Sequence, residues 1–252
     1  MIRVCVVGAA GRMGTEAVRT VLAADDMELV LAVDTAGGEV SGVQVLDSFP
    51  RPLSGCDVMV ELTHAESATE HAVHAAESGV SPVIGASGLD ASQQKRVADA
   101  CKSAGIGGIL VPTFAIGAVL MMRFAAEAAK WLPNAEVIEM HHDKKLDAPS
   151  GTGIRTAELI SQARRSKRNP DPTTKVKFEG ARGAVVEDVP VHSVRLPGLV
   201  AHQAVMFGGE GEVLTLRHDS MNRLSFMPGV LLAVRGVRSL PGFTVGLDAL
   251  ME

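Results

Sequence analysis

A glycine-rich turn near the start of the chain most constrains what this sequence can fold into. The apolar run from Ile2 to Val7 predicts a short buried strand, and Gly8-Ala9-Ala10-Gly11-Arg12-Met13-Gly14 follows it directly. A helical pattern then runs from Glu16 to Leu22. A strand that passes through glycines into a helix leaves backbone N–H groups free to hold a pyrophosphate. The turn therefore predicts a domain that binds a dinucleotide.

Asp34 favours this interpretation over a purely structural glycine turn. It closes the next apolar run, Leu29 to Val33, 20 residues beyond Gly14. An acidic side chain at this point accepts hydrogen bonds from the adenosine ribose. Its charge should repel a 2′-phosphate, so we expect NADH or NADPH as cofactor, with NADH favoured. The G-x-x-G-x-x-G spacing of the turn differs from the commoner G-x-G-x-x-G.

Short apolar runs alternate with amphipathic stretches through the rest of the first half. Strands are predicted at 58–62, 82–84 and 109–111, and helices at 68–76 and 92–101. This alternation is typical of βαβ crossovers and a parallel sheet.

The second half has a different pattern. Helices are predicted at 117–131, 151–164 and 225–235, and a strand at 136–142. Three further strands, at 189–196, 199–207 and 212–218, follow one another without a helical pattern between them. Gly208-Gly209-Glu210-Gly211 suits a hairpin because glycine tolerates positive φ. We therefore expect an antiparallel layer in this half.

Composition excludes several classes of function. The net charge is −5, and the aromatic residues are seven Phe, one Trp and no Tyr, so nucleic acid is not an expected partner. No apolar run reaches the roughly 18–20 residues of a membrane span, and no signal sequence precedes the first strand, so we expect a soluble, cytoplasmic protein that does not bind membranes. Cys5, Cys56 and Cys101 form no C-x-x-C pair, which predicts neither disulfides nor a structural zinc site.

A cationic segment follows the strand predicted at 136–142. His141, His142, Lys144 and Lys145 lie within five positions, which suits an anionic substrate that needs a proton. Ser150 is a good helix N-cap, and the N–H groups of Gly151-Thr152 could hold a carboxylate, although an ordinary capped helix would have the same sequence. The paired histidines could also bind a metal, but no Cys or carboxylate stands at ligand spacing, so no metal is predicted.

Two further turns follow predicted strands of the first half. They are Gly85-Ala86-Ser87-Gly88 and Val111-Pro112-Thr113-Phe114, and both should lie at the edge where α/β sheets bind ligands. Either could also be simple loop sequence. The remaining histidines are interpreted as structural or surface groups: His64, His71, His74, His192, His202 and His218.

These motifs together resemble the dihydrodipicolinate reductase (4-hydroxy-tetrahydrodipicolinate reductase) family. The resemblance covers essentially the whole chain and rests on the following segments: 7–14, 139–152, 180–183, 191–198, 207–211 and 217–220. It implies an α/β protein with a Rossmann-type parallel-sheet domain (1–112 and 225–252). It also implies an α+β domain (113–224) with a mainly antiparallel sheet, which binds substrate and builds a homotetramer. The implied activity is NAD(P)H-dependent reduction of a cyclic imine dicarboxylate in lysine and diaminopimelate biosynthesis.

The resemblance also assigns site residues. His141 would be the acid/base group and Lys145 the proton donor, with substrate held by His142, Ser150, Gly151 and Thr152. The cofactor would be lined by Gly8, Ala9, Ala10, Gly11, Arg12, Met13, Asp34, Gly85, Ala86, Ser87, Val111, Pro112, Thr113 and Phe114. The family commonly has Gly-Thr-Thr-Gly at 85–88 and Pro-Asn-Phe at 112–114. The departures at Ala86 and Thr113 could each remove a hydrogen bond worth about 0.5–1.5 kcal/mol.

Two other functions remain as alternatives. Another two-domain NAD(P)-dependent dehydrogenase would typically need a nucleophilic Cys or a different base, and no Cys lies in the second half. A non-catalytic, dinucleotide-sensing regulator would need a partner-binding module, and no basic helix-turn-helix is found.

Overall fold

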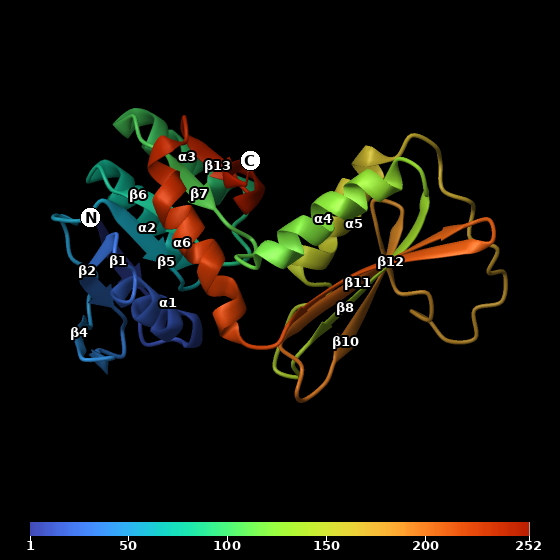
Figure 1. Cartoon of the computed structure of the whole chain (residues 1–252), viewed down its shortest axis with the longest axis horizontal. Coiled ribbons are helices and arrows are strands. Elements are labelled where there is room, and N and C mark those ends of the chain that lie inside the picture. Colours follow the sequence, from blue (N-terminus) through green and yellow to red (C-terminus); the bar gives the residue numbers. More distant parts are fainter. Residues whose placement is uncertain (252) are drawn as a thin grey trace. The chain divides into compact units, whose positions relative to one another are not determined.

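The first strand and helix, β1 (Ile2–Val7) and α1 (Arg12–Leu22), open the first of two units into which this computed structural model divides. The structure describes residues 1–251. The first unit comprises Met1–Ile116 and the segment that begins at Arg223, and the second comprises Gly117–Asn222. Each unit has its own sheet, and the α/β fold class expected from the sequence is confirmed (Figure 1).

The sheet of the first unit has the strand order β13-β7-β6-β5-β1-β2-β4-β3. Neighbouring strands run parallel except β3 and β4. The other strands are β2 (Met27–Val33), β3 (Gly38–Val40), β4 (Val43–Leu46), β5 (Val58–Glu61), β6 (Ser81–Ile84), β7 (Gly108–Leu110) and β13 (Phe243–Val245). The helices after α1 are α2 (Ala65–Glu77), α3 (Ala91–Ala104) and α6 (Met227–Gly236), with short 3-10 turns at Arg223–Phe226, Val237–Ser239 and Leu247–Leu250.

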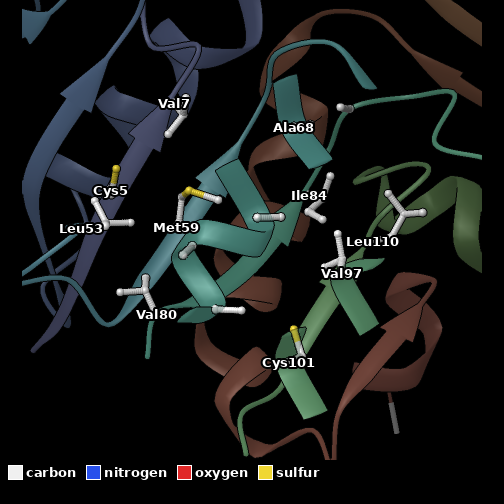
Figure 2. Packing of buried hydrophobic residues seen from close by; sticks show 14 of the residues in the cluster. Cys5, Val7, Leu53, Met59, Ala68, Val80, Ile84, Val97, Cys101 and Leu110 are labelled. Atoms are coloured by element: carbon white, nitrogen blue, oxygen red, sulfur yellow. The ribbon is translucent and has the colours of Figure 1, made fainter. Parts of the chain in front are cut away.

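Helices cover both faces of this sheet. Ala68 of α2 and Val97 of α3 pack in one cluster with Met59 and Ile84 of the strands (Figure 2). On β1 the alternate residues Val4 and Val6, which point to the opposite face, are also fully buried. Helices α1 and α6 contact each other in this unit. Burial on both faces explains why the strands read as continuous apolar runs.

Three differences from the predicted elements have local causes. Helix α1 begins at Arg12, whereas the sequence predicted a start at Glu16. The earlier start was not predicted because Gly14 interrupts the apolar pattern of the first turn. Strands β3 and β4 form an unpredicted hairpin through Ser41 and Gly42, whose φ values of 52° and 80° fit a tight two-residue turn. Strand β13 was not predicted either, because a run of three residues is too short to show the alternating apolar pattern of a strand.

The second unit has the strand order β12-β11-β8-β10-β9. Its strands are β8 (Asn134–His141), β9 (Ala184–Val186), β10 (Val189–Arg195), β11 (Ala201–Gly209) and β12 (Glu212–Ser220). Its helices, α4 (Ile116–Ala129) and α5 (Gly151–Ala163), lie on one face of the sheet (Figure 1). The hairpin predicted at the glycine-rich link is confirmed, since β11 and β12 pair antiparallel up to Gly209 and Glu212.

The expectation that the three last strands form one antiparallel layer was wrong for β10. This strand lies beside β8 and runs parallel to it, while β11 pairs antiparallel with the other edge of β8. The reason is the long connection from β8 through α5, which crosses over the sheet and returns the chain in the same direction. The remaining pairs are antiparallel, so the sheet is mainly antiparallel as expected.

Candidate functional site

The glycine turn of the first unit leaves no room for side chains at two positions. A Cβ on Gly14 would lie 1.9 Å from the carbonyl oxygen of Gly8. At Gly8 φ is +80°, and a Cβ would lie 3.1 Å from the backbone carbonyl group of Leu62. The turn therefore needs glycine both for its backbone conformation and for the close approach of α1 to β1.

The N-terminus of α1 fits the pyrophosphate of a dinucleotide. Its N-cap, Gly11, offers no side-chain hydrogen bond, and the first turn has no acidic residue. The first N–H groups of a helix have no partner within the helix, and the helix dipole places partial positive charge there. Such an end is a ready site for an anion.

Asp34 lies against this turn in the structure. Its Oδ2 accepts a hydrogen bond from the Ala10 N–H at 3.1 Å, and its Oδ1 accepts one from the Ala36 N–H at 3.0 Å. The backbone of the turn is further fixed by hydrogen bonds from the N–H groups of Gly8 and Ala9 to the Val33 carbonyl. The sequence-distant carboxylate and the glycine turn therefore form one local structure.

The two other turns lie at the same edge of the sheet, because β1, β5, β6 and β7 are parallel neighbours. A Cβ on Gly85 would lie 2.5 Å from Cε2 of Phe114, so the two turns pack directly against each other. Phe114 is 4% exposed and Ala86 is also buried, whereas Ser87 and Pro112 are exposed. Thr113 Oγ1 accepts a hydrogen bond from the Ala115 N–H at 3.3 Å.

In the second unit, a fully buried carboxylate lies at the centre of the predicted catalytic segment. Glu139 of β8 is 0% exposed, and its Oε2 lies 2.6 Å from Nδ1 of His141. Arg195 of β10 donates to both of its oxygens, from Nη1 to Oε2 at 3.0 Å and from Nη2 to Oε1 at 2.8 Å. The backbone N–H of Ser150 donates to Oε1 at 3.2 Å.

These donors keep Glu139 ionised. Burial by itself would raise the pKa of this carboxyl group, but hydrogen bonds from His141, Arg195 and Ser193 outweigh burial and lower the pKa to about 2. At neutral pH Glu139 is therefore a carboxylate that only accepts hydrogen bonds.

Lys145 lies on the turn that follows β8. Its Nζ is 2.7 Å from Oδ1 and 2.9 Å from Oδ2 of Asp147. Burial tends to raise the pKa of the Asp147 carboxyl group, but the hydrogen bond from Lys145 outweighs it and the pKa is lowered. The carbonyl oxygen of Asp147 accepts a hydrogen bond from Nη2 of Arg195 at 2.8 Å. Arg195 thus joins the segment that carries Lys145 to Glu139.

Helix α5 begins beside this network. Ser150 is its N-cap, as predicted, and Oγ of Ser150 accepts a hydrogen bond from the Gly153 N–H at 3.1 Å. The first turn contains no acidic residue. The N–H groups of Gly151 and Thr152 lie before the first intrahelical hydrogen bond, so they can serve an anionic group.

The structure therefore brings the predicted site residues together in two sets. The glycine turn, Asp34 and the turns at 85–87 and 111–114 gather in the first unit. His141, Lys145 and the start of α5 gather in the second, with His142 directly after the last residue of β8. Among the described residues, no group of three or more His, Cys, Asp or Glu side chains is placed to hold a metal ion.

Glu139 and Arg195 were given no role in the sequence prediction. Glu139 could have been found, because it lies two residues before His141 and a strand places such residues on the same face. Arg195 could not have been found from sequence spacing, since it lies 56 residues from Glu139.

Three of the histidines expected to be structural have a ring nitrogen 2.7–2.8 Å from a carboxylate oxygen. They are His71 with Glu61, His192 with Glu136 and His202 with Asp219.

Comparison with known proteins gives full-length matches. A family model for "Dihydrodipicolinate reductase, N-terminus" matches residues 2–114, and one for "Dihydrodipicolinate reductase, C-terminus" matches residues 117–251. The 4-hydroxy-tetrahydrodipicolinate reductase of Halalkalibacterium halodurans is 46% identical over 265 residues, covering 100% of both chains. That of Lysinibacillus sphaericus is 47% identical over 262 residues, covering 98% of each. The solved structure of dipicolinate-bound dihydrodipicolinate reductase from Paenisporosarcina sp. TG-14 matches with a TM-score of 0.80 and 41% identity, covering 99% of each chain.

Proposed function

The chain belongs to the dihydrodipicolinate reductase family, as its motifs predicted, and we propose that it reduces 4-hydroxy-tetrahydrodipicolinate, a cyclic imine dicarboxylate, to tetrahydrodipicolinate. It is an NAD(P)H-dependent oxidoreductase of lysine and diaminopimelate biosynthesis. The observation that carries the proposal is the identity of 46–47% with 4-hydroxy-tetrahydrodipicolinate reductases over practically the whole chain.

The first unit fits the cofactor. We infer that the dinucleotide lies against residues 8–13, with Asp34 accepting hydrogen bonds from the ribose and the turns at 85–87 and 111–114 lining the remainder. The bound nicotinamide supplies the hydride for the reduction. The uncapped N-terminus of α1 and the absence of room for side chains at Gly8 and Gly14 support this assignment.

The second unit fits an anionic substrate. His141 or Lys145 donates the proton that the ring accepts during reduction, and the positive charge of Lys145 attracts a dicarboxylate in a chain whose net charge is −5. His142 and the N–H groups of Gly151 and Thr152, at the helix start capped by Ser150, hold a substrate carboxylate. The first domain (1–112 and 225–252) thus binds the dinucleotide, and the second (113–224) binds the substrate.

Asp34 supports a preference for NADH. Its carboxylate lies against the glycine turn, where it would repel the 2′-phosphate of NADPH. Replacing Asp34 with Asn keeps an oxygen acceptor but removes the charge. We expect Asp34→Asn to lower the ratio of the NADPH dissociation constant to the NADH dissociation constant by about fivefold, since a contact between two charges in water is worth about 1 kcal/mol. Calorimetric titration with each cofactor measures this, and an unchanged ratio contradicts the preference.

We also propose that the protein is a cytoplasmic homotetramer built by the second domain. The supporting observation is that the sheet of this domain exposes apolar side chains, with Val185 and Val213 each 66% and Met206 41% exposed. A contiguous patch of such side chains is typical of an association surface. Among the described residues no helix combines the length and apolarity needed to cross a bilayer. Light scattering of the purified chain tests the tetramer, and cell fractionation tests the location.

A coupled assay tests the activity. The substrate is generated in situ from pyruvate and aspartate semialdehyde with the preceding synthase, and the loss of NADH or NADPH absorbance is followed. We expect oxidation that depends on the synthase and on both of its substrates. If well-folded protein oxidises neither cofactor, the proposed function is wrong. If it also fails to bind either cofactor in calorimetry, the assignment of the first domain is wrong as well.

A further inference from the structure

We propose that Glu139 is the positioning residue of the catalytic segment, which orients His141, fixes the turn that carries Lys145 and anchors the start of α5. The proposal rests on the proposed function, because the residues that Glu139 positions are those assigned to proton transfer and substrate binding. Glu139 itself acts through its neighbours. It is fully buried, so it has no direct access to substrate.

The contact with Glu139 fixes the tautomer of His141. Oε2 of Glu139 lies 2.6 Å from Nδ1 of His141, and an ionised carboxylate can only accept a hydrogen bond. The proton of a neutral His141 ring is therefore held on Nδ1. Its Nε2, on the far side of the ring, is left to exchange a proton with a ligand. A carboxylate that holds one ring nitrogen in this way fixes both the tautomer and the orientation of the ring.

The carboxylate of Glu139 is itself held in place by three hydrogen bonds. Arg195 binds it with two parallel hydrogen bonds, and the Ser150 N–H adds a third contact from the backbone. The same guanidinium group also donates to the carbonyl oxygens of Val194 and Asp147. Because the Asp147 side chain binds Lys145, the position of Lys145 depends on Arg195 and, through it, on Glu139.

Helix α5 begins at the same carboxylate. The hydrogen bond from the Ser150 N–H to Glu139 ties the N-cap of this helix to β8. Gly153 permits this contact, since a Cβ there would lie 3.3 Å from Cγ of Glu139, a tight approach. The helix start that would hold a substrate carboxylate is therefore fixed to the same group as the acid/base residue.

The same strand provides a matched control. Glu136 also lies on β8 but three residues away, so it points to the opposite face of the sheet. It too binds a histidine and an arginine, with Oε2 2.8 Å from Nε2 of His192 and Oε1 in contact with Arg182. A change at Glu136 removes the same kind of carboxylate pairing without touching the catalytic segment.

The kinetic experiment compares Glu139→Gln, Glu139→Asp and Glu136→Gln in the full-length chain, using the coupled assay and NADH titration by calorimetry. For Glu139→Gln we expect kcat to fall by about 10²-fold or more, the range typical of a misaligned acid/base group. Glu139→Asp keeps the charge, so its kcat should be about tenfold higher than that of Glu139→Gln. The dissociation constant of NADH should stay within about twofold in all variants, because the cofactor residues lie in the first unit.

The control variant and the wild type give the decisive outcomes. Glu136→Gln should keep kcat within about twofold of wild type, with an unchanged oligomeric state by light scattering. A kcat of Glu139→Gln within about threefold of wild type overturns the proposal, and so does an equal loss in Glu136→Gln, which would indicate a general structural role. If Glu139→Gln does not fold, Glu139→Asp decides: a kcat equal to wild type overturns the proposal, and a reduced kcat with unchanged NADH binding supports it.

A spectroscopic measurement on the wild type needs no turnover. We expect the 15N spectrum of His141 to show a protonated Nδ1 and an unprotonated Nε2 for the neutral ring. The opposite tautomer overturns the proposal. Because this result is independent of the assay, an inactive wild type with the Nδ1–H tautomer would refute the proposed function and leave the positioning by Glu139 intact.

Discussion

The Cβ atom of an alanine at position 14 would lie 1.9 Å from the carbonyl oxygen of Gly8. Helix α1 can thus pack against β1 only because residue 14 has no side chain. We expect Gly14→Ala to destabilise the first unit by about 1–3 kcal/mol or more and to abolish NADH binding, because the backbone must shift. Thermal unfolding and calorimetric titration measure both effects. Gly242→Ala is the control, since a Cβ there meets nothing within 4 Å; equal losses in the two variants would contradict the explanation.

The contact between Gly85 and Phe114 predicts a coupled pair of substitutions. A Cβ on Gly85 would lie 2.5 Å from Cε2 of the Phe114 ring. Gly85→Ala should therefore lower stability by about 1–3 kcal/mol. Phe114→Leu removes the ring edge, so the double variant should be more stable than the sum of the single effects by about 0.5 kcal/mol or more. Urea unfolding of the wild type, the two single variants and the double variant measures the coupling free energy, and strictly additive effects would exclude it.

Lys145 is expected to affect turnover and not cofactor binding. Lys145→Ala should lower kcat by about 10²–10⁴-fold, because it removes the proposed proton donor. The dissociation constant of NADH should change by less than about twofold. Lys130→Ala is the control, since Lys130 of the second unit also forms an ion pair with a carboxylate, that of Glu127, outside the site. Turnover of Lys145→Ala within a few-fold of wild type would disprove the role.

The cap of α5 is expected to affect both stability and substrate binding. Ser150→Ala removes the acceptor of the Gly153 N–H and should cost about 1 kcal/mol. Because the frayed helix start would also hold the substrate carboxylate less well, KM for the imine should rise while the affinity for NADH stays the same. Ser161→Ala, on the same helix but away from the cap, should change neither quantity. An unchanged KM for the imine in Ser150→Ala would show that the cap does not contribute to substrate binding.

The ion pair between Arg3 and Asp57 predicts a specific dependence of stability on pH. Side-chain and backbone hydrogen bonds from Arg3 lower the pKa of Asp57 from 3.8 to about 2. A lowered pKa contributes stability that is fully present above the unfolded pKa and is lost as the pH falls through the folded pKa. Wild type should therefore be more stable than Asp57→Asn above about pH 4, and this advantage should vanish towards about pH 2. Urea midpoints across this range test it, and a constant difference would refute it.

The arrangement of the first unit could largely be predicted from local sequence signals. The run Ile2–Val7, the glycines after it and the alternation of strands and helices each depend on neighbouring residues only. The N-cap at Ser150 and the hairpin between β11 and β12 are signals of the same kind, and both were predicted. The family itself is recognisable from such motifs, because they place specific residues at fixed short spacings.

The pairing of β10 and the centre of the proposed catalytic segment were decided by tertiary structure. Local pattern identifies β10 as a strand but does not say whether it pairs with β8 or β11, because that choice depends on how the connection through α5 crosses the sheet. The same pairing brings Arg195 to Glu139 across 56 residues of sequence. The sequence by itself thus predicted which residues are candidates for the chemistry, because their motifs have short fixed spacings, whereas only the folded sheet brought Glu139 and Arg195 together beside them.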